Sequence, residues 1–114
     1  MKTLIVVGLF ESVGDARDVC NRLHTEGVSD GNCAHMRLKE IDLVASTSGA
    51  GLAVLSIDAR VFGNIRDRFA KFIGNGETAV LVRAESDADA TYASDVLRLF
   101  TPIAIEVFEF EPAR

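Results

Sequence analysis

Residues 3–16 read TLIVVGLFESVGDA, and residues 78–90 read TAVLVRAESDADA. Each stretch is an apolar run followed by Glu-Ser. An aspartate lies three residues after the serine, and an alanine follows the aspartate. Such a run predicts a strand that is buried on both faces, which is typical of the centre of a sheet. A serine with an aspartate three residues later predicts the start of a helix, because their side chains can cap free backbone amides.

The two units are compatible with an internal repeat and equally with convergence, since capping residues after strands are common. In the first unit the apolar residues continue at helical spacing, at Ala16, Val19, Cys20 and Leu23. In the second unit they continue at Ala90, Ala93, Leu97 and Phe100. Gly27 and Pro102 are expected to end these two helices. A further strand should follow each helix, one within 34–44 and one at 103–110. The alternation breaks near Glu40, which indicates a bulge or an early strand end.

A third helix is expected between the two units. Its apolar face consists of Val61, Phe62, Ile65, Phe69, Phe72 and Ile73. Gly74 and Gly76 should end it. The preceding run LAVLSI at 52–57 fits either a short strand or the lead-in to this helix.

This order of elements predicts one α/β domain over residues 1–114, with halves at about 1–44 and 77–111 and a helical linker at 45–76. Two βαβ units with right-handed crossovers build a ferredoxin-like sandwich with a four-stranded, mainly antiparallel sheet. The first and last helices should cover one face of the sheet. The middle helix or a second subunit should cover the other, because an uncovered apolar face is unfavourable in water. We therefore expect a homodimer or larger oligomer, with an interface formed by Phe108, Phe110, Phe62 and Phe69.

Composition restricts the expected partners. The chain has 114 residues, 48% of them hydrophobic, and a net charge of −5. That charge repels phosphate backbones and anionic lipid, so neither nucleic acid nor a membrane is an expected partner. The apolar run at 4–10 is too short for a membrane span. Two cysteines do not form a disulfide framework in a chain of this length, so reduced thiols and a cytoplasmic location are expected.

The opening VVGLFESVGDARDVCNRLHTEGV resembles the start of small bacterial α/β domains described as heat-induced or general stress proteins. Phe10, Ala16, Leu23 and Gly27 occupy the places that carry the likeness, and GNGETAVLVRAES at 74–86 is similar to the C-terminal half of that family. The resemblance implies a related α/β fold and a role in stress. It brings no catalytic residues, because the family has none established.

Cys20, His24, Cys33 and His35 are the strongest candidates for chemistry. Cys20 and His24 lie four apart on a helix, and Cys33 and His35 lie two apart on an extended segment, so each pair shares a side. Two cysteines with two histidines form the ligand set of a tetrahedral zinc site. The alternatives are that Cys20 is a small core residue and His24 a solvated one. For redox chemistry Cys33 is the better candidate, since it is expected on a loop near His35 and Cys20 is expected to be buried.

No phosphate-binding loop and no pair of carboxylates placed for acid–base catalysis is present in the sequence. The sequence therefore favours a non-enzymatic, oligomeric domain with a regulatory or accessory role and no cofactor. Two alternatives stay open. One is a zinc-binding or thiol-redox protein that uses the Cys/His residues. The other is a small ferredoxin-like enzyme with a pocket under the middle helix, acting on an unknown small molecule.

Overall fold

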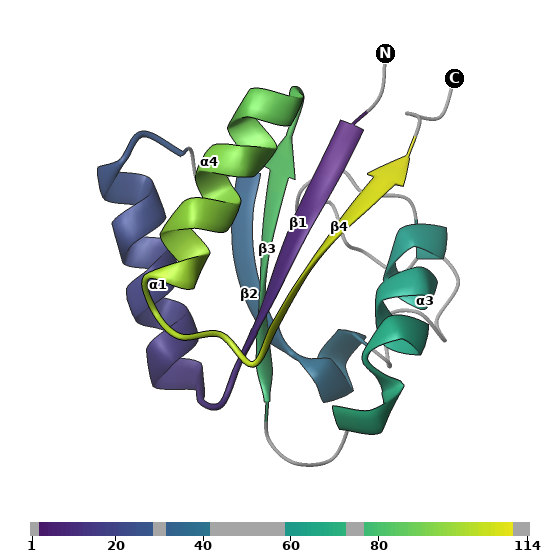
Figure 1. Ribbon diagram of the computed structural model, residues 1–114. Coiled ribbons are helices and arrows are strands. Elements are labelled where there is room, and N and C mark those ends of the chain that lie inside the picture. The colour runs from purple at the N-terminus through teal and green to yellow at the C-terminus, as the bar shows by residue number, and fades with distance from the viewer. Residues whose placement is uncertain (1–2, 29–31, 42–58, 73–76, 111–114) are drawn as a thin grey trace.

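The computed structural model describes residues 3–28, 32–41, 59–72 and 77–110. Within them, four strands form one sheet (Figure 1): β1 (Thr3–Phe10), β2 (Cys33–Arg37), β3 (Thr78–Ala84) and β4 (Ala104–Phe110). Their order in the sheet is β2-β3-β1-β4, and all neighbouring strands pair antiparallel. The helices are α1 (Val13–Thr25), α3 (Ala59–Arg68) and α4 (Asp87–Arg98), and a 3-10 turn follows α3 at Ala70–Phe72. None of the helices in these ranges is long enough and apolar enough to span a bilayer.

Both predicted helix starts are confirmed. The Ser12 hydroxyl accepts a hydrogen bond from the backbone amide of Asp15, and the Ser86 hydroxyl accepts one from Asp89, each at 3.1 Å. After α1, Gly27 adopts a φ of 103°, a left-handed conformation that glycine takes without a steric penalty. The short polar stretches that follow β1 and β3 therefore turn the chain directly into helices.

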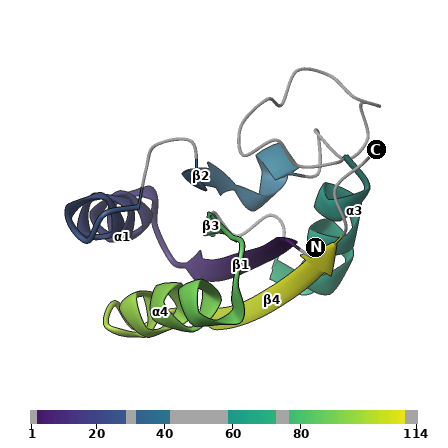
Figure 2. The ribbon, with the colours of Figure 1, turned by 90° about the horizontal axis from the view of Figure 1, so that it is seen from above.

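The sheet is covered on both faces. Figure 2 shows α1 and α4 on one side of the sheet and α3 on the other. Alternate residues of β1 enter the two cores, with Leu4, Val6 and Phe10 in the core under α1 and α4, and Ile5, Val7 and Leu9 in the core under α3. This confirms that the first strand is central and buried on both faces. It also confirms that the middle helix contributes to covering the second face, through Val61, Ile65 and Phe69.

The second strand ends early, at Arg37. Residues 38–41 turn into a helix, which brings the side chains of Leu38 and Ile41 into the core under α3. The amide of Leu38 donates to the carbonyl oxygen of Glu77 at 3.1 Å, and the amide of Arg37 donates to Oε1 of Glu40 at 3.0 Å. The break in alternation near Glu40 thus marks an early strand end. The run at 52–57 lies outside the described residues.

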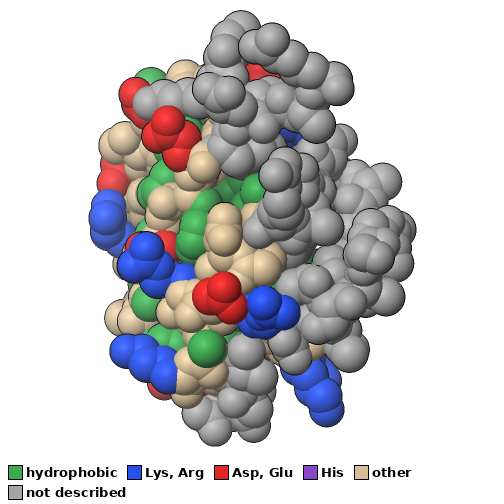
Figure 3. Space-filling model, turned by 90° about the vertical axis from the view of Figure 1, so that its right-hand side faces the viewer, with side chains coloured by type: hydrophobic (Ala, Val, Ile, Leu, Met, Phe, Trp, Pro, Cys, Tyr) green, Lys and Arg blue, Asp and Glu red, His purple; other side chains and the backbone are tan. Residues whose placement is uncertain are grey.

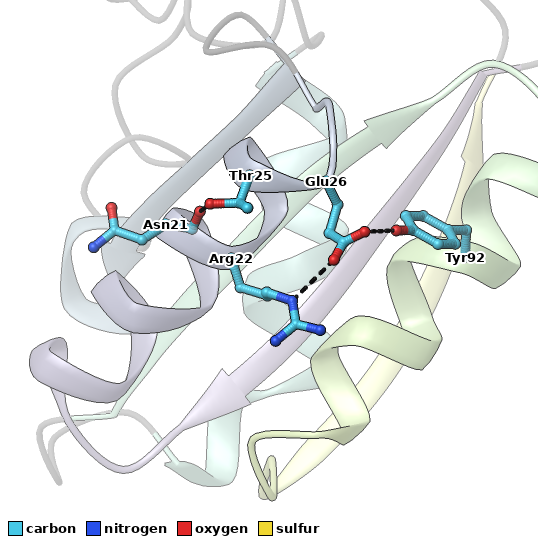
Figure 4. Close-up of polar contacts among 5 residues, drawn as sticks. All are labelled: Asn21, Arg22, Thr25, Glu26 and Tyr92. Atoms are coloured by element: carbon cyan, nitrogen blue, oxygen red, sulfur yellow. Dashed lines mark hydrogen bonds and ion pairs between the residues drawn. The ribbon is translucent and has the colours of Figure 1, made fainter.

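A polar contact joins the two helices on the first face. The Tyr92 hydroxyl of α4 donates to Oε1 of Glu26, just after α1, while Nε of Arg22 contacts Oε2 of the same carboxylate at 3.0 Å (Figure 4). The hydrogen bond from Tyr92 is the main reason why the pKa of Glu26 is lowered, and the same bond raises the pKa of Tyr92. The contact therefore holds the end of α1 against α4.

The four phenylalanines predicted at a subunit interface have different environments. Phe69 is 2% exposed in the core under α3, so the chain itself covers its ring. Phe108 of β4 is partly buried against the same core. The side chains of Phe62 and Phe110 are outside the described part of the structure. On the side that carries α3, hydrophobic side chains lie among charged ones (Figure 3).

Candidate functional site

The structure brings together three of the four Cys and His residues that the sequence singled out. Cys20 lies on the buried side of α1, and Cys33 begins β2. The thiol of Cys33 donates to Sγ of Cys20 over 3.4 Å, and Nδ1 of His35 lies 3.7 Å from the same sulfur. The sheet register explains this arrangement. Cys33 and His35 pair with Val82 and Val80, whose side chains enter the core under α1 and α4.

His24 does not join this contact group. It lies one turn after Cys20 on α1, and its side chain is exposed. The charge interaction between His24 and Cys20 still makes a small contribution to lowering the pKa of Cys20. The site is therefore a pair of thiols with one adjacent imidazole, and we call Cys20, Cys33 and His35 the thiol cluster.

The thiol cluster favours the thiolate form of Cys20. Its pKa is lowered from 9.0 to about 6, mainly because the Cys33 thiol donates a hydrogen bond to its sulfur. Burial raises the pKa, but the hydrogen bond and positive charge of His35, with a smaller contribution from the charge of His24, add to the lowering. A cysteine with a pKa near 6 is about nine-tenths thiolate at pH 7.

One expectation about the cysteines was wrong and one was confirmed. Cys33 was expected on a loop, but it is the first residue of β2 and is 6% exposed. Cys20 was expected to be buried, and it is 5% exposed. Burial disfavours a thiolate only where no donor compensates for the lost water. Here Cys33 and His35 supply that compensation, so Cys20 is the activated thiol.

The chemistry that this site can perform is that of a thiol pair. Within the ranges that the structure describes, no group of three or more His, Cys, Asp or Glu side chains is arranged to hold a metal ion. The zinc alternative stays a prediction. Neither cysteine is in a disulfide. Two reduced sulfurs in contact, one of them a thiolate, are the starting arrangement for a disulfide.

A depression under the middle helix, expected for a small enzyme, also exists. It has a volume of about 500 Å³ between α3 and β4 and is lined by Asn64, Asp67, Arg68 and Phe108. Nearby, Arg68 and Glu106 form an ion pair of 3.8 Å with both side chains partly exposed. The activated thiol lies on the opposite face of the sheet, so this depression and the thiol cluster are separate sites.

These features define the class of protein. The fold is a mixed α/β fold with a four-stranded antiparallel sheet, and the site is a buried thiol pair beside an imidazole. No protein-family model, no curated protein and no solved structure matches this chain. The resemblance to general stress proteins accordingly stays a prediction.

Proposed function

We propose that this chain is a thiol-based redox-responsive domain in which Cys20 and Cys33 form a reversible disulfide. The contact of 3.4 Å between the two sulfurs is the observation that carries the proposal. A disulfide bond is about 2.05 Å long, so the sulfurs must approach each other by about 1.4 Å from their distance of 3.4 Å. Small side-chain rotations of Cys20 and Cys33 can supply such a movement without separating α1 from β2.

A peroxide is the oxidant class that suits this site. The Cys20 thiolate attacks one peroxide oxygen, the O–O bond breaks, and an alcohol or water leaves after taking up a proton. The resulting sulfenic acid is attacked by the sulfur of Cys33, which loses its proton, and the sulfenic hydroxyl leaves as water. Two thiols and one peroxide thus give one disulfide, one alcohol or water, and one water. Because both cysteines are about nineteen-twentieths buried, a small peroxide is favoured over a bulky disulfide.

Mass spectrometry of the protein after brief treatment with hydrogen peroxide tests this function. We expect the intact chain to lose the mass of two hydrogens and a digest to contain the Cys20 peptide joined to the Cys33 peptide. In Cys33→Ser the disulfide cannot form, so a sulfenic acid on Cys20 should accumulate and be trapped by dimedone. Asn21→Gln, which changes an exposed, uncharged side chain of α1 outside the thiol cluster, should form the disulfide as the unchanged protein does.

Two outcomes would contradict the proposal. One is oxidation of both cysteines to sulfinic or sulfonic acids with no disulfide within the chain. The other is a disulfide found only between chains, because the contact that carries the proposal lies within one chain.

We also propose that the arrangement of strands is ferredoxin-like. The support is that α1 connects β1 to β2 with β3 between them in the sheet, and α4 connects β3 to β4 with β1 between them. Two interleaved βαβ units of this kind, with both crossover helices on one face, are characteristic of that class.

Self-association through β4 is a second candidate function, and the exposure of Val107 favours it. β4 is an edge strand, and Val107 is 49% exposed on it. Edge strands with exposed apolar side chains are common sites of pairing between chains. We expect native mass spectrometry to show a dimer at micromolar concentration and Val107→Glu to be monomeric, with Glu109→Gln as a matched change on the same strand. A monomer at every concentration would refute this candidate.

A further inference from the structure

A second cavity lies beside the thiol cluster and shares His35 with it. Its volume is about 310 Å³, and it is lined by Val13, His35, Met36, Arg37, Glu40 and Thr78. These residues come from the start of α1, the end of β2, the helical residues 38–41 that follow it, and the start of β3. The cavity therefore lies where α1, β2 and β3 meet, at one edge of the core under α1 and α4.

Groups that can hold an anion lie around this cavity. Arg37 contributes a guanidinium, and His35 contributes an imidazole. Val13 is the first residue of α1, a helix of 13 residues whose N-terminal end carries a partial positive charge. Glu40 is the one acidic residue among those that line the cavity, and its Oε1 already accepts a hydrogen bond from the backbone of Arg37.

Thr78 supplies an independent indication of a ligand. It is 0% exposed and is one of the residues that line the cavity. Its hydroxyl oxygen is buried and has no hydrogen-bond partner among the residues that the structure describes. Register pairing places Thr78 directly opposite Arg37, with both side chains on the same face of the sheet. Buried hydroxyl groups almost always have a partner, so a bound water or a ligand oxygen is expected at this one.

We propose that this cavity binds a small oxyanion, a phosphate or carboxylate group, held by Arg37, the hydroxyl of Thr78 and the N-terminal end of α1. Arg37 would pair two of its N–H donors with two oxygens of the anion. Thr78 would donate its hydroxyl from below, and the free amides at the start of α1 would face the negative charge. The site goes beyond the redox function and does not depend on it, because neither sulfur lines the cavity.

The test is an NMR titration of the ¹⁵N-labelled protein with inorganic phosphate, and separately with acetate, at constant ionic strength. We expect saturable chemical-shift changes at the amides of Val13, Gly14 and Thr78 with at least one of the two anions. The anion that binds with the higher affinity identifies the preferred group. Arg37→Gln and Thr78→Val should each weaken binding by about tenfold, as loss of a single charged or buried hydrogen bond does.

Three further variants distinguish binding at this cavity from a general effect of charge or of misfolding. Lys39→Gln removes an equal charge two residues from Arg37 at a position that does not line the cavity, so it should bind as the unchanged protein does. Thr78→Ser keeps the hydroxyl and should retain binding, which separates loss of the donor from loss of structure. Cys20→Ser should still bind the anion, so a failure of the redox function would leave this result intact.

The proposal is overturned if the shifts follow ionic strength without saturating. It is also overturned if Arg37→Gln and Lys39→Gln weaken binding equally, because the anion would then respond only to overall charge. In either case water fills the cavity and satisfies Thr78.

Discussion

Cys20 is expected to react with iodoacetamide at a rate that rises through a pH near 6, instead of near the ordinary thiol value of 9.0. The thiolate is the reacting form, so the rate follows its fraction and levels off above pH 7. The lowered pKa comes first from the thiol of Cys33 and then from His35. Mass spectrometry of the alkylated peptide gives the rate for Cys20 alone, separately from any reaction of Cys33.

Two substitutions at Cys33 separate the hydrogen bond from the second sulfur. Cys33→Ala removes the donor, so the pKa of Cys20 should rise, and its alkylation rate at pH 7 should fall about 5- to 30-fold. Cys33→Ser keeps an O–H donor and should retain most of the rate, although it can form no disulfide. His35→Ala should also slow the reaction, because a hydrogen bond and a nearby positive charge are both lost. An unchanged pH profile in both Cys33→Ala and His35→Ala would show that the thiol cluster does not activate Cys20.

Phe69→Ala is expected to lower the free energy of unfolding by about 3–5 kcal/mol. Phe69 is 2% exposed and packs with Val61, Ile65 and Leu81 in the core between α3 and the sheet. Loss of its ring removes buried apolar surface and leaves a cavity that the surrounding side chains fill only in part. Urea denaturation followed by circular dichroism measures the change.

The matched control for this prediction is Leu99→Ala. Leu99 is 67% exposed after α4, so its truncation should change the free energy of unfolding by less than about 0.5 kcal/mol. The same experiment distinguishes a core role of Phe69 from the interface role expected from the sequence. Loss of a core residue lowers stability equally at all protein concentrations, whereas loss of an interface residue gives a concentration-dependent change. A loss below about 1 kcal/mol would mean that α3 does not cover this face as the structure has it.

The helix starts and the central strands were predictable because their signals are local. Ser12 and Ser86 lie three residues before Asp15 and Asp89, and a capping hydroxyl reaches only that far along the chain. The unbroken apolar run of β1 indicated burial on both faces, since one face of a strand needs only every second residue to be apolar. The sequence did not determine that β2 ends at Arg37, because the break in alternation near Glu40 fitted a bulge as well as an early strand end.

The thiol cluster was decided by the tertiary structure. The sequence placed Cys20 and Cys33 on separate elements, and periodicity cannot show whether two such elements bring their side chains into contact. The sheet register does so, because it sets Cys33 and His35 on the face of β2 that α1 covers. The pKa of Cys20 follows from that contact, since a sulfur buried alone would have a raised pKa and one that accepts a hydrogen bond from Cys33 has a lowered one. The sequence by itself therefore determined which segments form strands and helices, through interactions a few residues apart, and the packing of α1 on the sheet decided which cysteine is activated.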